Sequence, residues 1–222
     1  MARYERKFFI DGISSLEVEN IVYANPGMFS EIYQTRSINN IYLDTIELAS
    51  FNDNVSGVMN RKKFRIRWYG KLFGFIEKPN LEIKIKTGLV GSKKIYPLKP
   101  LELNTGFICN DIMQHLQDSN LSEDITKKLA FLRPVIMNKY SRKYFVSFDK
   151  KYRITVDINQ SYCGVSGNSI LSKQKNTCDT NTILEMKYNI EHDNNASAIT
   201  NFFPFRLTKS SKYVNAIANL YY

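Results

Sequence analysis

Charged and apolar residues alternate without interruption over residues 81–86. A β-strand has a side-chain period of two, so Glu82, Lys84 and Lys86 share one face and three aliphatic residues share the other. Taken alone, this pattern is typical of an edge strand with its charged face in water. The pattern recurs at residues 64–68, 152–158 and 184–188, where cations and a few carboxylates again lie on one side. The repetition indicates that these strands form one surface.

The remaining periodicities predict further strands and several short helices. We expect strands at 3–8, 38–43, 61–69, 137–148 and 183–190, and a loop or ragged hairpin at 70–79. Apolar residues at helical spacing predict two amphipathic helices at 104–116 and 122–132, the second ended by Pro134. Further helices are expected near 14–25, 44–51, 194–203 and 213–220, and a mobile loop at 159–181.

Composition favours one domain that interacts with an anion. The chain of 222 residues is 43% hydrophobic, enough to form a single α+β domain over residues 1–222. It holds 31 Lys and Arg against 21 Asp and Glu, a net charge of +10. The partner or substrate is therefore expected to be nucleic acid, a phosphorylated small molecule or a membrane surface.

Several classes of protein are excluded by what the sequence lacks. No run of about 18 apolar residues occurs, and the first seven residues are charged where a signal peptide would be apolar. The three cysteines form no CxxC pair and the two histidines lie far apart, which argues against a disulfide framework and a zinc site. We expect a cytoplasmic protein.

The charged faces pose a physical problem that the fold must solve. If the apolar faces pack against helices, the basic side chains point together, and an uncompensated buried charge costs several kcal/mol. An antiparallel sheet curled into a closed or nearly closed tunnel, with phosphates inside and helices outside, meets this requirement. A flat sheet with one face in water meets it equally well. The residues of this face are Lys7, Arg65, Arg67, Lys84, Lys86, Arg142, Arg153 and Lys187.

Eight short motifs occur in order between residues 4 and 212: YERKF at 4–8, YLDT at 42–45, RIR at 65–67, LEIK at 81–84, KYSRKYF at 139–145, RITVD at 153–157, LEMK at 184–187 and KSSK at 209–212. Together they resemble the motif series of the VTC domain. This domain is the polyphosphate polymerase module of the vacuolar transporter chaperone complex, within the CYTH or triphosphate tunnel metalloenzyme superfamily. The resemblance implies a β-tunnel that binds triphosphate and Mn²⁺ or Mg²⁺. It also implies transfer of the γ-phosphate of ATP onto a growing polyphosphate, with release of ADP.

The resemblance also implies roles for individual residues. Those expected to act on the transferred phosphate are Arg65, Arg67, Lys84 and Lys212. Those expected to hold nucleotide or product phosphates are Lys7, Arg142, Arg153, Lys187, Lys209 and Ser211. Glu185 matches the family's metal-ligating glutamate, and Glu82 and Glu5 are further candidate ligands. Asp157 is expected either to orient Arg153 or to contact the metal, and Asp44 to cap a helix.

A chemical argument separates polymerase from hydrolase. Tunnel hydrolases resemble one another in a Glu-x-Glu-x-Lys opening strand, whereas the first position of that pattern here is Arg3, and Lys187 follows Glu185 by two residues. Chain growth uses a terminal phosphate oxygen as the nucleophile, which needs little help from a general base. We therefore favour transfer over hydrolysis, although Glu5 occupies the second glutamate position of the hydrolase pattern.

Two other classes of function stay open. One is a triphosphate hydrolase acting on inorganic triphosphate or on RNA 5′ ends, and the other is a non-catalytic module that binds polyphosphate or inositol phosphate. Nucleic acid ranks last among the partners, because Trp68 and most tyrosines fall at core-like positions. The expected ligands are ATP and a polyphosphate or pyrophosphate primer, and any coupling to export would need a separate membrane partner.

Overall fold

A computed structural model describes residues 3–88, 90–104, 109–166, 169–170 and 181–221. Its strands are β1 (Arg3–Ile10), β2 (Ser30–Asp44), β3 (Asn60–Tyr69), β4 (Gly74–Ile76), β5 (Asn80–Thr87), β6 (Val90–Pro97), β7 (Leu101–Leu103), β8 (Arg133–Val146), β9 (Tyr152–Ser166), β10 (Ser169–Ile170) and β11 (Thr182–Asn189). Its α-helices are α1 (Ser15–Tyr23), α2 (Ala49–Val55), α3 (Cys109–Asp118), α4 (Glu123–Leu129), α5 (Asp193–Thr200) and α6 (Lys212–Tyr221). A 3₁₀ turn at Ile190–His192 precedes α5.

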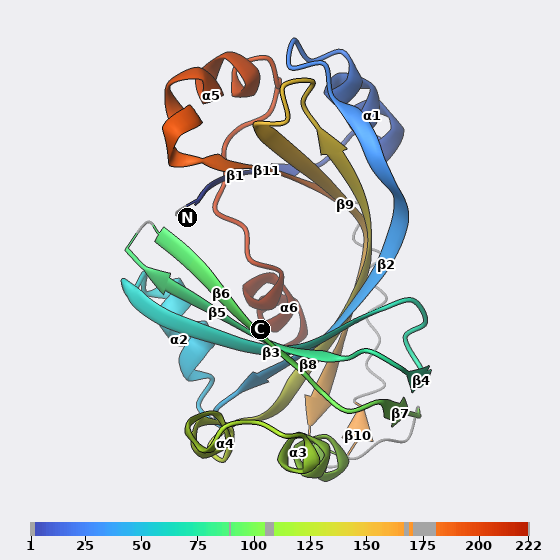
Figure 1. Cartoon of the computed structure of the whole chain (residues 1–222), viewed down its shortest axis with the longest axis vertical. Coiled ribbons are helices and arrows are strands. Elements are labelled where there is room, and N and C mark those ends of the chain that lie inside the picture. Colours follow the sequence, from blue (N-terminus) through green and yellow to red (C-terminus); the bar gives the residue numbers. More distant parts are fainter. Residues whose placement is uncertain (1–2, 89, 105–108, 167–168, 171–180, 222) are drawn as a thin grey trace.

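Antiparallel strands form one large sheet in an α+β fold. The strand order is β1-β11-β9-β8-β2-β3-β5-β6, with β10 paired to β9, and β4 and β7 form a separate two-stranded sheet. The sheet curls strongly, so that its two end strands, β1 and β6, approach each other (Figure 1). The prediction allowed a closed or a nearly closed tunnel. Full closure is wrong, because β1 and β6 are the two ends of the hydrogen-bonded ladder.

The gap between the two end strands, β1 and β6, is called the seam here. The chain segment before α6 and one ion pair lie in it. The Thr208 amide donates to the Lys7 carbonyl at 2.8 Å, and the Phe9 amide donates to Thr208 Oγ1 at 3.0 Å. Across the seam, Lys84 Nζ lies 3.6 Å from Glu5 Oε2. The residues before α6 therefore satisfy part of the free edge of β1, and an unpaired edge would otherwise be open to other chains.

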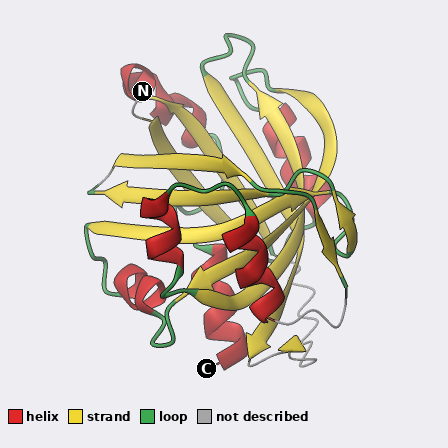
Figure 2. Cartoon of the chain, turned by 60° about the horizontal axis from the view of Figure 1, so that its bottom comes forward, coloured by secondary structure: helices red, strands yellow, loops and turns green. Residues whose placement is uncertain are grey.

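The apolar faces of the strands pack outward against helices, as the alternation predicts. Leu81 and Ile83 of β5 lie in a buried cluster with Ile112 and Leu116 of α3. A second cluster joins β1, β9 and β11 to α1 and α5, which cover the upper part of the sheet in Figure 1. Helices lie against the strands in the view from below as well (Figure 2). The opposite, inner face of the curled sheet therefore carries the charged residues.

Helix α6 differs from the others because it packs inside the curl. Tyr213, Ala216 and Ile217 are buried against Tyr42 and Ile136 of the inner face. The Tyr213 and Tyr42 rings stack with centroids 5.1 Å apart. The hydroxyl of Tyr213 donates to Asp44 Oδ2. Figure 1 shows α6 within the curl of the sheet, near the C-terminus, so this helix covers part of the inner face.

Some predicted boundaries are wrong. Helix α4 ends at Leu129, and Pro134 lies in β8, opposite Leu43 of β2. Of the loop or ragged hairpin expected at 70–79, the loop is found, interrupted by β4, which pairs with β7. Much of the predicted loop at 159–181 is strand, since β9 continues to Ser166, while 171–180 lie outside the described residues. The capping role of Asp44 is confirmed, because its carboxylate accepts from the amides of Ser50 and Phe51 at the start of α2.

None of the helices in the described part of the chain has the length and apolar character needed to cross a membrane.

Candidate active site

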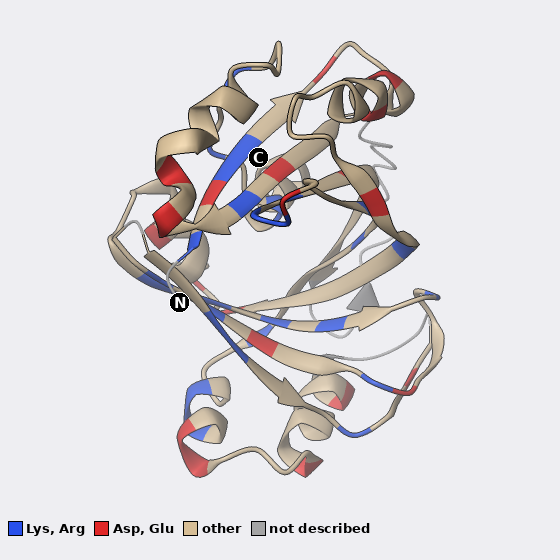
Figure 3. Cartoon of the chain, turned by 45° about the horizontal axis from the view of Figure 1, so that its top comes forward, with Lys and Arg blue, Asp and Glu red and all other residues tan. Residues whose placement is uncertain are grey.

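Strand register brings basic residues that are far apart in sequence onto the inner face. Arg65 and Arg67 of β3 lie opposite Glu82 and Asn80 of β5. Arg142 of β8 lies opposite Asp157 of β9. On the other side of the curl, Lys7 of β1 lies opposite Glu185 of β11. Figure 3 shows basic and acidic positions interspersed along strands on both sides of the curled sheet.

Glu82 holds three cations from neighbouring strands. Its carboxylate accepts from Arg65 Nε at 2.9 Å and from Lys93 at 2.8 Å, and Arg67 Nη1 lies 3.5 Å away. Burial acts to raise the pKa of Glu82, but Arg65 and Arg67 outweigh it and lower the pKa to about 2. The same carboxylate raises the pKa of Arg65 against the opposing effect of burial. Glu82 is therefore fully engaged by cations.

Asp157 contacts a second set of cations, Arg142 and Lys212, instead of the predicted partner Arg153. Its side chain is fully buried. Asp157 Oδ2 accepts from Arg142 Nη2 at 2.7 Å and lies 2.5 Å from Lys212 Nζ, and Oδ1 accepts from Arg142 Nε. Burial opposes ionisation, yet Arg142 and Lys212 lower the pKa of Asp157 to about 2. The prediction that Asp157 orients Arg153 is therefore wrong. We call Arg65, Arg67 and Glu82 together with Arg142, Asp157 and Lys212 the paired centre.

Two carboxylates flank the ammonium group of Lys7. Lys7 Nζ lies 2.7 Å from Glu5 Oε1 and 4.0 Å from Glu185 Oε2, and Lys187 Nζ lies 2.6 Å from Glu185 Oε1. Burial acts to raise the pKa of Glu185, but Lys7, Lys187 and Arg142 hold it well below its usual range. The described residues contain no group of three or more His, Cys, Asp or Glu side chains that could hold a metal alone. Glu5 and Glu185 are therefore the carboxylates here that could contribute to a site for Mg²⁺ or Mn²⁺, which keep several non-protein ligands.

Lys63 belongs to the inner face although no motif contains it. It lies directly opposite Lys84, which in turn lies opposite Lys93, and we call Lys63, Lys84 and Lys93 the lysine row. Lys63 Nζ donates to Asn54 Oδ1 at 2.8 Å and to Ser211 Oγ at 2.9 Å. Burial first, and then the neighbouring charges of Lys84 and Arg61, lower the pKa of Lys63 to about 7. Strand alternation could have identified Lys63 from the sequence, because Lys63 precedes Arg65 by two residues and so shares its face.

The remaining predicted residues lie at the margins of this face. Arg153 shares its strand face with Asp157 but is exposed, and it forms no ion pair within the described chain. Lys209 is exposed and lies close enough to Lys86 to contribute to the lowered pKa of that lysine, after burial and Arg61. Ser211 is partly buried and contacts Lys63. Ser211 therefore joins the segment before α6 to β3.

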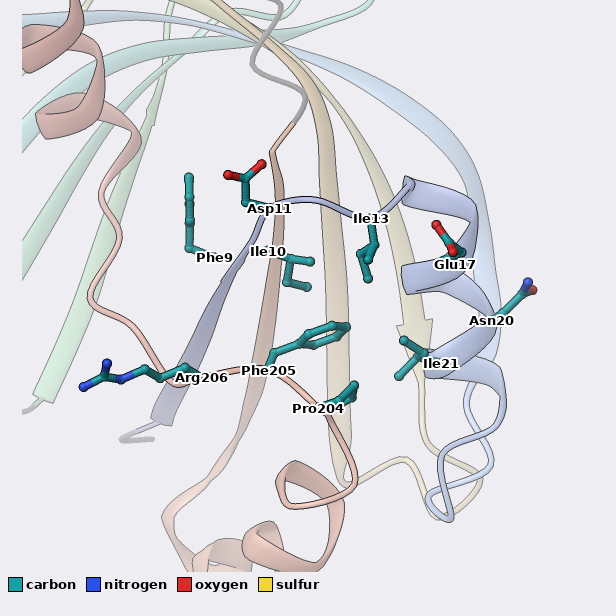
Figure 4. Close-up of a pocket in the computed structure, with 10 residues that line it drawn as sticks. All are labelled: Phe9, Ile10, Asp11, Ile13, Glu17, Asn20, Ile21, Pro204, Phe205 and Arg206. Atoms are coloured by element: carbon teal, nitrogen blue, oxygen red, sulfur yellow. The ribbon is translucent and has the colours of Figure 1, made fainter.

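An apolar groove of about 670 Å³ lies apart from these charges. It is formed between β1, α1 and the segment at 204–206, and Figure 4 shows Ile13, Ile21 and Phe205 among its walls. None of the predicted site residues lines it. The groove is therefore a feature separate from the candidate active site.

Comparisons with known proteins find solved structures of similar fold. Similar folds occur in a Pyrococcus horikoshii protein (10% identity, TM-score 0.53, covering 98% of this chain and 99% of that chain) and in a candidate adenylate cyclase from Vibrio parahaemolyticus (10%, 0.54, 98% and 98%). A candidate adenylyl cyclase from Hippeastrum, described as having a dominant triphosphatase activity, is also similar (12%, 0.54, 99% and 97%). A search of curated proteins finds no match. A model of the VTC domain matches residues 2–221, and the chain therefore belongs to the VTC domain family.

Proposed function

We propose that this domain is a metal-dependent polyphosphate polymerase that transfers the γ-phosphate of ATP to a growing polyphosphate chain and releases ADP. Membership of the VTC domain family supports a function related to polyphosphate or triphosphate. The observation that carries the proposal is the convergence of cations from β1, β3, β5, β8 and the start of α6 on one inner face. A row of phosphates supplies the negative charge that this face lacks.

In this proposal the basic residues bind and orient the phosphates. Arginine forks bind two phosphate oxygens at a time, so Arg65, Arg67 and Arg142 hold the nucleotide phosphates in a fixed orientation. Lys84 and Lys212 place compact positive charges beside the transferred group, where charge is spread over its oxygens in the transition state. The binding surface extends along the polyphosphate chain through further polar residues, namely Lys7, Arg153, Lys187, Lys209 and Ser211.

Glu185 and Glu5 are the residues we propose to hold the metal. Both carboxylates already lie beside one cationic group, the ammonium of Lys7, so a divalent ion with bound phosphate finds both of them nearby. When bound, Mg²⁺ or Mn²⁺ would neutralise and bridge phosphate oxygens. Glu82 is less suited to this task, because Arg65, Arg67 and Lys93 already engage its oxygens.

The ionisation of the carboxylates favours transfer over hydrolysis. A hydrolase needs a base that accepts a proton from water, and a general base is most effective with a pKa near the working pH. The pKa values of Glu82 and Asp157 are lowered to about 2, and that of Glu185 lies well below its usual range. These three carboxylates are therefore poor bases. A phosphate oxygen at the end of a chain is already ionised and needs no such group.

The second candidate is a triphosphate hydrolase, and the position of Glu5 favours it. Glu5 reaches the inner face beside Glu185, as the second glutamate of a hydrolase opening strand would, and contacts both Lys7 and Lys84. The dominant triphosphatase activity described for the Hippeastrum protein is in line with this alternative.

A product assay separates the two candidates. The purified protein is incubated with ATP, Mn²⁺ and a pyrophosphate primer, and the products are run on a polyphosphate-stained gel beside assays for ADP and free phosphate. Polymer formed together with ADP is the expected result. Free phosphate in proportion to ADP, with no polymer, would assign the domain to the hydrolases.

The Glu185→Gln variant tests the metal assignment in the same assay. Because the amide keeps the shape but loses the charge, we expect metal-dependent turnover to fall by at least about 100-fold, while binding of tripolyphosphate without metal is largely kept. Glu191→Gln, in the exposed turn before α5, is the matched control. Undiminished turnover in Glu185→Gln would refute the assignment.

A further inference from the structure

Tyrosines and an arginine gather on the inner face beside the paired centre. Arg36 of β2 lies directly opposite Arg142, and Tyr33 lies opposite Tyr144. Directly opposed residues share a face of the sheet, so these side chains continue the face that carries Arg142. Tyr69 follows Arg67 by two residues on β3 and shares its face as well. We call Tyr33, Arg36, Tyr69 and Tyr144 the tyrosine cluster.

Rings and cations alternate from the paired centre into this cluster. Lys212 Nζ lies 4.7 Å from the Tyr140 ring centroid, and the Arg142 guanidinium lies 5.3 Å from the same centroid. Arg142 is also 6.0 Å from the ring of Tyr144. The Arg36 guanidinium follows, 5.4 Å from the Tyr144 ring and 4.4 Å from the Tyr33 ring. The tyrosine cluster is therefore physically continuous with the proposed phosphate site.

The outer members of the cluster are exposed, unlike most tyrosines of the sheet. Tyr33 is 50% and Tyr69 52% exposed, whereas Tyr42 and Tyr140 are at most 5% exposed. Arg36 is exposed and forms no ion pair with a carboxylate in the described part of the chain. The expectation placed most tyrosines at core-like positions, and Tyr33 and Tyr69 are exceptions to it. Exposed aromatic side chains beside a charged site are typical of a binding surface.

We propose that the tyrosine cluster binds the base of a nucleoside triphosphate whose phosphates contact Arg142 and the cations beyond it. This inference rests on the proposed function. Flat aromatic rings and guanidinium planes are the groups on which bases stack in proteins, and the cluster offers both. The ribose joins the base to the phosphates over a short distance, which matches a stacking surface directly beside Arg142. Stacking is tolerant of base identity, so ATP and GTP are expected to bind with similar affinity.

The test compares two ligands that differ by the nucleoside. Calorimetric titrations measure the affinity of a non-hydrolysable ATP analogue and of inorganic tripolyphosphate for the wild-type protein and for Tyr33→Ala, Tyr69→Ala and Tyr33→Phe. We expect each alanine variant to weaken binding of the ATP analogue by about 5- to 100-fold while changing tripolyphosphate affinity by less than about twofold. Tyr33→Phe keeps the ring and should keep the affinity for the analogue.

Tyr23→Ala is the matched control, because Tyr23 is 48% exposed and lies on α1, outside the curl. Equal losses for both ligands, or unchanged affinity for the ATP analogue in both alanine variants, would overturn the base site. In the second case the proposed function still stands, because tripolyphosphate binding reports on the phosphate site alone. If the wild-type protein binds neither ligand, the proposed function fails and the base site fails with it.

Discussion

The paired centre and the lysine row use the same kinds of residue on the same face of one sheet, but their charges are balanced differently. In the paired centre, Glu82 and Asp157 each contact at least two cations. In the lysine row, Lys93 shares Glu82 with the paired centre at 2.8 Å, Lys63 contacts no carboxylate in the described part of the chain, and Lys84 has Glu5 across the seam at 3.6 Å.

The pKa values record this difference. Against the opposing effect of burial, Asp157 and Glu82 raise the pKa values of Arg142 and Arg65. Burial lowers the pKa of Lys63 to about 7 and that of Lys84 to about 8, with too little negative charge nearby to offset it. The cations of the paired centre therefore have carboxylate partners of their own, whereas Lys63 and Lys84 of the lysine row have little negative charge nearby, which we expect a bound anion to supply.

The largest expected effect comes from removing a carboxylate of the paired centre. Asp157→Asn leaves Arg142 and Lys212 buried without a counter-charge, which should lower the free energy of unfolding by about 3–5 kcal/mol in urea titrations. The exposed pair of Glu123 and Lys127 provides the control, since Glu123→Gln should change stability by less than about 0.5 kcal/mol. A similar small loss in both variants would mean that the paired centre contributes no special stability.

The same residue predicts a pH dependence of stability. Because the folded-state pKa of Asp157 is about 2 and the ordinary value is 3.8, its stabilising contribution is present above about pH 4 and is lost as the pH falls towards 2. Unfolding measured at steps through this range should show that the Asp157→Asn variant lacks this part of the acid-induced loss. Parallel curves for the variant and the wild-type protein would contradict the assignment.

Removing an arginine from the paired centre should weaken both phosphate ligands together. Arg65→Ala removes a guanidinium group from the inner face. We expect the affinities for ATP and for polyphosphate each to fall by about 10- to 100-fold, as when a hydrogen bond to a charged group is lost. Arg133→Ala, at the exposed start of β8, controls for loss of net charge. Unchanged affinity for both ligands would show that Arg65 has a structural role alone.

Removing a charge from the lysine row should change stability in the opposite direction from removing one from the paired centre. Lys63→Met removes repulsion between like charges on neighbouring strands, so stability should increase by about 0.5–1 kcal/mol. Polyphosphate affinity should fall in the same variant, by about fivefold, because an unpaired cation is lost. Thermal unfolding and titration of one protein sample measure both changes. A loss of stability would show that the contacts of Lys63 with Asn54 and Ser211 outweigh the repulsion.

The smallest expected effect is the dependence of anion binding on pH. A lysine whose pKa is lowered to about 7 or 8 is charged below that pH, and a bound phosphate favours the charged form. Polyphosphate affinity should therefore decrease by about tenfold or less from about pH 6 to about pH 9, while the stability of the free protein rises over that range. The decrease should be smaller in Lys63→Met, and a decrease of equal size would assign the titration to other groups.

The sequence predicted which residues share a face better than it predicted which residues meet. Alternation placed Arg65, Arg67 and Glu82 on one side, because side-chain period is a local property. It did not predict that Asp157 contacts Arg142 and Lys212, since that depends on β9 lying beside β8 in a register that local sequence does not determine. Whether the sheet closes fully or leaves a seam between β1 and β6 was left open for the same reason.

Residues outside the matched motifs were also missed. Lys63 obeys the same alternation as Arg65, but the matched motif begins at Arg65 and does not include Lys63. Tyr69 ends the predicted strand at 61–69 and Tyr33 precedes the one predicted at 38–43, and the structure shows both side chains to be exposed. Partial burial of a side chain is a tertiary property, and single-strand patterns do not report it.

A structure with tripolyphosphate and Mn²⁺ bound tests the central claim most directly. The account predicts a row of phosphates on the inner face, in contact with Arg142 of the paired centre and Lys63 of the lysine row, and an anomalous manganese signal beside Glu185. Phosphates bound on the outer surface alone, with the lysine row unchanged, would contradict it.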